Sequence, residues 1–178
     1  MKSLKPTKLS HSSRPFSNKA AGFTLMELCI VAGVIAILAS VGVVTVTREL
    51  PHYRLKGDAG TIHRSFMTAR TQATSSGLQH AIEFDLDASP QVYVLRQGNA
   101  NSGSTTWRLL SYKKELSPGI SIAQINDGAV KTSGKVQIIF NPNGSSGTGE
   151  VRLGSATNGY RVWLTPTTGR VQVRKGWT

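Results

Sequence analysis

Cysteine is almost absent from this 178-residue sequence, because Cys29 is the only one. A single cysteine cannot form a disulfide within the chain, and it cannot supply a site built from several thiolates. Cys29 also lies inside a long apolar run, away from the part of the sequence that has the pattern of a folded domain. We therefore exclude a disulfide framework and a thiolate metal site.

Acidic residues are also scarce, with nine Asp and Glu against 21 Lys and Arg and a formal net charge of +12. Residues 1–22 contain five basic residues and no acid, so the remaining 16 basic and nine acidic residues leave a surplus of +7. A basic leader before an apolar run predicts that residues 1–22 lie in the cytoplasm and that the C-terminal part lies on the other side of the membrane. The surplus there indicates an anionic partner.

Groupings typical of catalytic or metal sites are also few. The four histidines show no metal-ligand spacing; they are His11, His52, His63 and His80. The acids Glu83, Asp85 and Asp87 alternate along one predicted strand and its turn, and we interpret them as a solvated face rather than a cation site. We predict that the protein is not an enzyme and holds no cofactor and no metal.

The sequence does contain a long apolar run of 22 residues, 23–44. A bilayer core needs roughly 20 apolar residues in a helix, so the run predicts a membrane span. Its one acid, Glu27, is costly there, because a carboxylate near the bilayer centre costs roughly 2.5 to 3.5 kcal/mol and is usually paired. Cleavage between Gly22 and Phe23 would place a new α-amino group about one helical turn from Glu27. We expect the amine of one subunit to pair with Glu27 of the next.

Two simpler interpretations of the run stay open. An ordinary secretory signal peptide also has a basic start and an apolar core, and Ser40-Val41-Gly42 has the small-x-small pattern of a cleavage site. The acid within the apolar core disfavours this interpretation. A plain signal anchor, in which Glu27 is incidental, is the other alternative.

The segment Gly22-Phe23-Thr24-Leu25-Met26-Glu27, between a basic leader and an apolar run, resembles the class III signal of type IV pilins and type II secretion pseudopilins. The resemblance implies that a prepilin peptidase, on the cytoplasmic side of the bacterial inner membrane, cleaves after Gly22 and methylates Phe23. It also implies that Phe23 and Glu27 form the charge pair of filament assembly, with other pilins or pseudopilins as partners.

Helical spacing continues beyond the apolar run. We expect a transmembrane and assembly helix over residues 23–50, a kink or boundary at Leu50-Pro51, and an amphipathic helix over residues 52–76 that stops at Gly77. One face of the second helix is apolar and should pack on a sheet. This face consists of Leu55, Ile62, Phe66, Ala69 and Ala73.

After Gly77, short alternating runs separated by turn residues predict eight strands. They cover residues 80–85, 91–97, 107–112, 120–124, 135–140, 149–153, 159–165 and 170–175. The expected fold is α+β and pilin-like, with a long N-terminal transmembrane helix followed by an antiparallel β-sheet domain over residues 51–178. The strand order is not fixed by these patterns.

Three segments of the C-terminal half resemble the GspH/FimT family of minor pilins and pseudopilins. They are Ile139-Phe140-Asn141-Pro142-Asn143-Gly144, Gly149-Glu150-Val151-Arg152-Leu153 and Thr168-Gly169-Arg170-Val171. The first hypothesis is a FimT-like minor pilin in type IV pilus assembly and priming, with DNA binding and uptake in natural transformation. The rival is an H-type minor pseudopilin of a type II secretion system. A hypothesis of another class is a membrane-tethered periplasmic binding module that never polymerises.

The DNA hypothesis depends on the tail, which has no acid after Glu150 and five candidate contacts: Arg152, Arg161, Arg170, Arg174 and Lys175. On an extended strand, Arg170 and Arg174 face the same way, while Val171 and Val173 face the core. At 3.3 Å per residue the two arginines are about 13 Å apart, a spacing that can bridge phosphates.

FimT-like members carry a Gly-Arg-x-Arg tail motif linked to DNA binding, and Gln172 stands here at its second arginine. Trp163 and Trp177 lie where they could stack on bases. The alternative is a solvated edge strand that its cations keep soluble.

Overall fold

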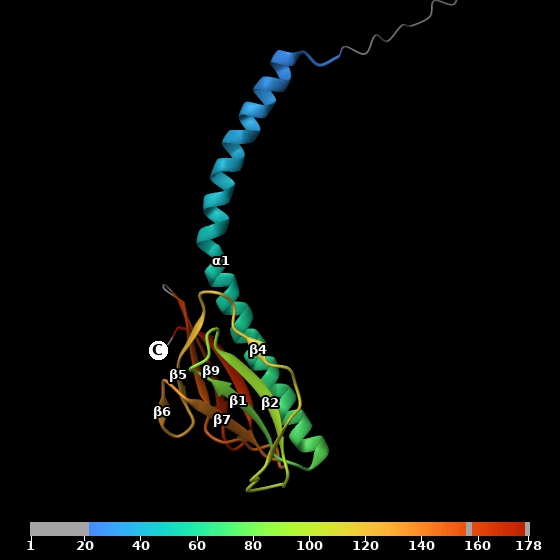
Figure 1. Cartoon of the computed structure of the whole chain (residues 1–178), viewed down its shortest axis with the longest axis vertical. Coiled ribbons are helices and arrows are strands. Elements are labelled where there is room, and N and C mark those ends of the chain that lie inside the picture. The colour runs from blue at the N-terminus through green and yellow to red at the C-terminus, as the bar shows by residue number, and fades with distance from the viewer. Residues whose placement is uncertain (1–21, 156–157, 177–178) are drawn as a thin grey trace, which may run out of the picture. The chain divides into compact units, whose positions relative to one another are not determined.

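A computed structural model describes residues 22–155 and 158–176, with the backbone but not the side chains of residues 40–48. All of the predicted leader except Gly22 lies outside the described residues, as does Trp177. The chain divides into two compact units, Met1–Gly42 and Val43–Thr178. Figure 1 gives the order of the elements along the chain, and the second unit contains all the strands.

Helix α1 (Leu25–Ser76) is 52 residues long and continues through Pro51. The boundary expected at Leu50-Pro51 therefore does not occur. Proline inside a helix removes one backbone hydrogen bond and crowds the preceding turn, at a cost of about 3 kcal/mol. The helix continues because its next turns, from Leu55 onward, bury an apolar face completely. That burial offsets the local cost, which the sequence pattern around the proline does not reveal.

The end of α1 agrees with the prediction. Gly77 follows the last helical residue with a φ of +71°, a left-handed conformation that glycine adopts without a steric penalty. Its N–H donates to the carbonyl of Ala73 at 3.1 Å, which satisfies one of the last carbonyls of the helix.

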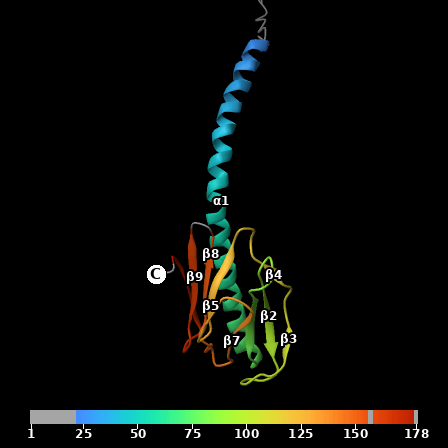
Figure 2. The ribbon, with the colours of Figure 1, turned by 60° about the vertical axis from the view of Figure 1, so that its left-hand side comes forward.

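The strands form two antiparallel five-stranded sheets. The first has the order β3-β2-β1-β7, with β4 also paired to β2. Its strands are β1 (His80–Asp85), β2 (Val92–Gly98), β3 (Trp107–Leu109), β4 (Lys114–Glu115) and β7 (Lys135–Phe140). The second has the order β10-β9-β8-β5-β6. Its strands are β5 (Ser121–Asn126), β6 (Val130–Lys131), β8 (Glu150–Gly154), β9 (Gly159–Thr165) and β10 (Arg170–Lys175). Figure 2 shows β5, β8 and β9 apart from β2 and β3.

All eight predicted strands occur, several with ends shifted by one or two residues, and two strands of two residues each were missed, β4 and β6. A two-residue strand is too short to show an alternating pattern. The predicted strand over residues 107–112 ends early, at Leu109. Leu110 N–H still donates to the carbonyl of Leu95 at 2.9 Å. The Ser111 hydroxyl then takes the place of a backbone carbonyl and accepts from Leu95 N–H at 3.1 Å.

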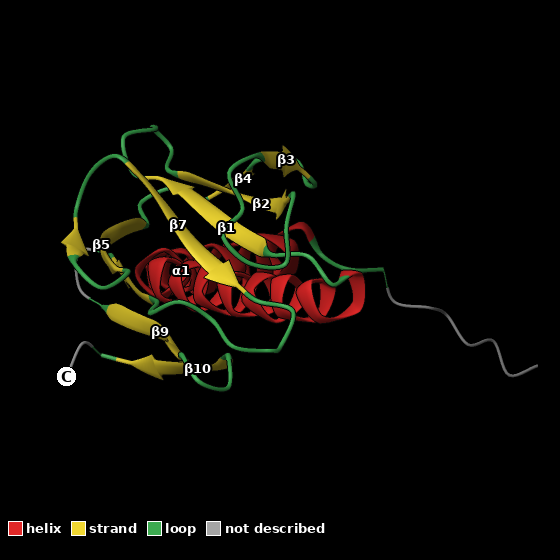
Figure 3. Cartoon of the chain, turned by 90° about the horizontal axis from the view of Figure 1, so that it is seen from below, coloured by secondary structure: helices red, strands yellow, loops and turns green. Residues whose placement is uncertain are grey.

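The predicted apolar face of α1 is fully buried and forms the centre of the core. Phe66 lies with its ring 6.1 Å from that of Phe84 on β1 and 5.7 Å from that of Phe140 on β7. The same core cluster contains Val151 of β8 and Val162 of β9, from the second sheet. Figure 3 shows the two sheets on different sides of α1. The buried side chains of α1 therefore belong to one core that both sheets share.

Candidate functional site

The first turn of α1 is capped by Thr24. Its Oγ1 atom accepts a hydrogen bond from the backbone N–H of Glu27 at 3.2 Å, and its carbonyl accepts from the N–H groups of Glu27 and Leu28 at 3.1 and 3.2 Å. Thr24 is thus the N-cap residue and Glu27 the third helical residue, as in a capping box. A carboxylate at this position also lies at the positive end of the helix dipole. The Thr-x-x-Glu spacing was a readable signal for this local role, and sequence reasoning missed it.

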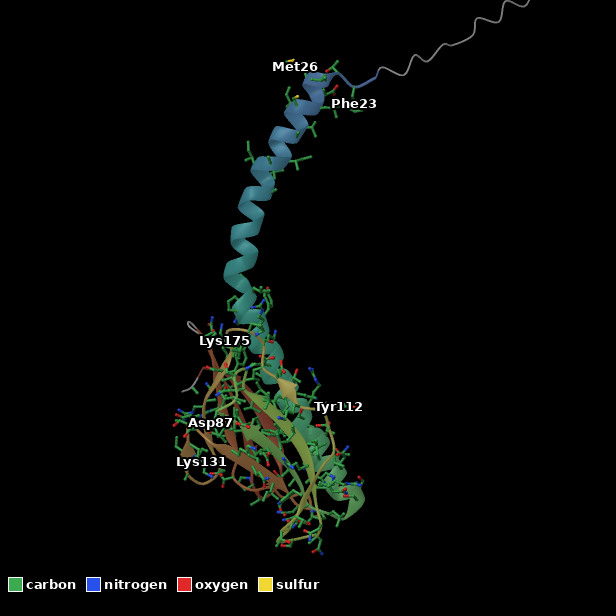
Figure 4. The ribbon with its side chains drawn as sticks, viewed as in Figure 1. Phe23, Met26, Asp87, Tyr112, Lys131 and Lys175 are labelled. Carbon is green, nitrogen blue, oxygen red and sulfur yellow. The ribbon has the colours of Figure 1, made fainter. Side chains whose placement is uncertain are left out.

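Apolar side chains surround the first turns of α1, and they are exposed. Their exposed fractions range from 47% at Val31 to 80% at Leu25. The set is Phe23, Leu25, Met26, Leu28, Ile30, Val31, Val34, Ile35, Ile37 and Leu38. Figure 4 shows Phe23 and Met26 projecting from the start of the helix. A contiguous apolar surface of this extent marks a site that binds another protein or a membrane.

Within the described residues, no helix is both long enough and apolar enough to cross a membrane. The transmembrane character expected over residues 23–44 is therefore not shown. Glu27 forms no ion pair with any residue in the described part of the chain. The pairing of Glu27 with the Phe23 amine of a neighbouring subunit, the cleavage after Gly22 and the methylation of Phe23 stay predictions.

The second candidate surface is the basic tail, and strand register brings three of its cations together. Arg161 of β9 lies opposite Arg152 of β8 and opposite Arg174 of β10. Directly opposite residues share one face of a sheet, and neighbouring strands lie about 4.8 Å apart. The α-carbons of Arg152 and Arg174 are therefore only about 10 Å apart. We call these three residues the arginine row.

Glu150, which was not among the predicted site residues, partly neutralises the arginine row. Glu150 precedes the acid-free tail in sequence, yet it lies on β8 and its Oε1 atom is 2.7 Å from Nε of Arg152 and 3.9 Å from Nη1 of Arg161. Arg161 also lies over the Trp163 ring, 4.7 Å from its centroid. Because Arg161 covers the indole, that ring face is already occupied.

Three of the tail cations, Arg170, Arg174 and Lys175, are exposed, and Figure 4 places Lys175 on β10. Lys175 lies opposite Tyr160, one residue beyond the Arg174 pair, so strand alternation puts it on the other face from the arginine row. Val171 is buried as predicted, but the prediction for Val173 was wrong, because Val173 is 39% exposed. β10 is the edge strand of its sheet, so only one neighbouring strand covers it.

Of the three acids interpreted as a solvated face, Asp87 is exposed, whereas Glu83 on β1 is largely covered. The Glu83 side chain is 12% exposed, and its carboxylate accepts from Arg96 Nη2 at 2.9 Å and from Gln137 Nε2 at 2.7 Å. Burial by itself raises the pKa of Glu83. The hydrogen bonds from Gln137 and Arg96, with the charges of Arg96 and Lys135, outweigh burial and hold this pKa below its ordinary value of 4.5.

The other two acids have partners of their own. Asp85 lies 3.9 Å from Nζ of Lys135, and Asp87 accepts from the N–H of Gly134 at 3.0 Å. His80, which begins β1, is buried with Nδ1 3.1 Å from the carbonyl of Leu78. Throughout the residues that the structure describes, no three His, Cys, Asp or Glu side chains are grouped to hold a metal ion.

Comparison with known proteins places the domain. The model of the family described as "Type II transport protein GspH" matches residues 58–168 of the chain. Two solved structures of the minor pseudopilin EpsH from the type 2 secretion system of Vibrio cholerae match with a TM-score of 0.53, at 13% and 14% identity. Each match covers 70% of this chain, and the two cover 99% and 96% of the EpsH chains. No curated protein matches the chain. At this identity the structural likeness shows the fold.

The lowered pKa of Glu83 makes its contribution to stability dependent on pH. A carboxylate whose pKa is lower in the folded than in the unfolded state stabilises the fold above the unfolded-state pKa, and this contribution is lost as the pH falls through the folded-state pKa. We expect the difference in free energy of unfolding between the native chain and Glu83→Gln to be largest near neutral pH and to shrink below pH 4.5.

Urea denaturation between pH 7 and pH 3 measures this difference. Asp87→Asn is the matched control, because Asp87 is exposed in the turn after β1 and has no basic side chain as an ion-pair partner among the described residues. A Glu83→Gln deficit of the same size at every pH would contradict the assigned role.

Proposed function

Because the chain belongs to the GspH family of type II transport proteins, we propose that it is a minor pseudopilin of a type II secretion system. On this proposal the protein is a structural subunit of a pseudopilus, without enzymatic activity or cofactor. The fold shared with EpsH supports this assignment over the pilus subunit, which was the first hypothesis from the sequence.

The observation that carries the proposal is the exposed apolar start of α1, on a chain whose folded domain belongs to the GspH family. Between Phe23 and Leu38 the large apolar side chains are about half exposed or more, from 47% at Val31 to 80% at Leu25. The cost of leaving so much apolar surface in water, about 25 cal/mol per Å², favours its burial in a lipid bilayer or against other helices. A filament subunit uses both environments in turn.

We propose the following order of events. The subunit is first held in the inner membrane by residues 23–44, with its C-terminal domain in the periplasm. Prepilin peptidase cleaves after Gly22, and the new Phe23 amine is methylated. The helix then leaves the bilayer and joins the pseudopilus, where the domain of Val43–Thr178 lies on the outside.

The charge of Glu27 is the proposed register device of this assembly. An isolated carboxylate in an apolar environment is unfavourable unless a cation meets it. The Phe23 amine of an adjacent subunit would meet it at one axial offset only, so apolar burial drives association while the charge pair selects the register. Thr24 caps the same helical turn through its hydroxyl and contributes no charge to the pair.

A second candidate function, DNA binding by a FimT-like minor pilin, is favoured by one feature of the tail. Arg170 and Arg174 lie exposed on an edge strand, and no ion pair joins either of them to an acid within the described residues. Against this candidate, Gln172 replaces the second arginine of the tail motif, and Glu150 engages the two other arginines of the row.

Substitution of Glu27 by Gln tests the pseudopilin proposal. Gln keeps the capping-box residue type but removes the charge. In cells that lack the native copy, we expect Glu27→Gln to reach normal levels in the membrane, to be recovered at least about tenfold less in sheared pseudopilus, and to leave exoprotein secretion unrestored. The measurements are immunoblots of membrane and filament fractions and an assay of a secreted enzyme.

Thr24→Ala is the matched control, because it removes the capping hydroxyl one turn away and leaves the charge. We expect it to restore secretion. Normal secretion with Glu27→Gln would contradict the assembly role and favour a tethered binding module that does not polymerise. A failure of Thr24→Ala as complete as that of Glu27→Gln would show that the helix start, rather than the charge, is decisive.

DNA binding is tested by titrating the full chain in detergent with duplex DNA at several salt concentrations. If Arg170 and Arg174 contact phosphates, Arg170→Ala/Arg174→Ala should flatten the dependence of log K on log salt by about two units. Arg152→Ala is the control. Because Glu150 already pairs with Arg152, removal of this arginine should change the salt dependence of binding less. An unchanged slope for the double variant would remove the tail from DNA binding.

A further inference from the structure

A groove of about 680 Å³ runs between the second half of α1 and the β2 side of the first sheet. Its helical wall is polar and includes Thr61, Arg64, Thr68 and Gln72. Its other wall is formed by residues of β2, β3 and β4 with the segment between β3 and β4. The groove is distant in sequence from the assembly residues, Phe23 and Glu27, and the proposed function does not use it.

The lining of the groove is cationic and apolar at once. Arg64, Arg108 and Lys114 line it, and no carboxylate does so among the described residues. Between these cations the floor is apolar, with Ile82, Leu95 and Leu110. A ligand that complements this surface carries negative charge at its ends and an apolar group at its centre.

Strand register gives the spacing of the cations. Arg108 lies opposite Gln97, and Lys114 lies opposite Tyr93, so both share the helix side of the sheet with these β2 residues. Gln97 and Tyr93 are four residues apart, which is about 13 Å on an extended strand. Leu95 lies midway between them on the same face.

Arg108 is already held in position for such a ligand. Its Nη2 atom donates to Oε1 of Gln97 at 2.9 Å, which leaves its other N–H groups free to meet a carboxylate. The opposite wall contains an unsatisfied acceptor, because Oε1 of Gln72 is buried without a hydrogen-bond partner in the described part of the chain. A buried unpaired acceptor is costly, and an incoming backbone N–H would satisfy it after rotation of the terminal amide.

We propose that this groove binds an extended segment of a partner protein with the pattern acid-x-apolar-x-acid. In an extended chain, residues i, i+2 and i+4 point to one side and span about 13 Å, which matches Lys114, Leu95 and Arg108. The carboxylates pair with Lys114 and Arg108, and the apolar side chain packs on Leu95 and Leu110. A small anion would leave the apolar floor in water, so a peptide fits better.

The partner is a different protein, because this chain has no such segment of its own. Glu83 and Asp87 are its only acids four residues apart, and the residue between them at the central position is Asp85 rather than an apolar residue. All three also lie on β1 or in the turn after it, where they have hydrogen-bonding or ion-pair partners. A second copy of the chain therefore does not supply the pattern.

The test uses a fluorescein-labelled peptide, Ser-Glu-Ser-Leu-Ser-Glu-Ser, titrated with the full chain in detergent and followed by fluorescence anisotropy. The control peptide Ser-Glu-Ser-Glu-Ser-Leu-Ser has the same composition with its acids two residues apart. We expect the first peptide to bind at least several-fold more tightly. Arg108→Ala/Lys114→Ala should weaken its binding about tenfold, because the double variant removes both cations that pair with the acids of the peptide.

Lys113→Ala is the matched control variant. Lys113 precedes Lys114 but lines a separate hollow with Glu83 and Asp85, so its loss should leave binding within about twofold. Thr68→Trp, at an exposed position of the helical wall, should fill the groove and abolish binding while circular dichroism stays unchanged.

Three results would overturn the proposal. Equal binding of the two peptides would show that the spacing of the acids does not matter. An equal loss of peptide affinity in Lys113→Ala and Lys114→Ala would show that binding depends on general charge attraction. The third result is self-association of the chain. If Lys114→Ala abolishes this self-association and the peptide does not compete with it, the groove binds a second copy of the chain.

Discussion

Both sheets of the domain depend on one apolar face of α1. The face that runs from Leu55 to Ala73 is fully buried, and the core around it takes side chains from both sheets. Full burial of each large apolar side chain is worth roughly 1.5 to 3 kcal/mol. Phe66, with an aromatic neighbour on β1 and another on β7, occupies the centre of this arrangement. The domain therefore folds on the C-terminal half of α1, whereas the apolar side chains at the start of α1 are exposed.

Charge is distributed over the domain in a way that separates two basic surfaces. On the outer face of β8 to β10, Glu150 and the Trp163 ring engage two members of the arginine row. In the groove beside β2, the cations line an apolar floor without any carboxylate among the described lining residues. A cation with an internal partner stabilises the fold, whereas one beside an apolar floor is suited to an outside ligand. Counting charges along the sequence does not distinguish the two.

Local features of this fold could be predicted from sequence because they depend on neighbours along the chain. The buried face of α1 follows from helical spacing, the stop at Gly77 from glycine, and the eight longer strands from alternation. The continuity of α1 through Pro51, the exposure of Val173 and the pairing of Glu83 with Arg96 depend on tertiary contacts. The groove depends on the register of β3 and β4 against β2, which no short-range pattern encodes.

In the proposed assembly, an amino group created by processing at Phe23 meets the charge of Glu27 on a neighbouring subunit. The most direct measurement is the intact mass and N-terminal sequence of the protein isolated from its own cells. We expect a chain that begins at Phe23 and carries one added methyl group. A chain that keeps its leader, or one that begins after Gly42, would contradict it.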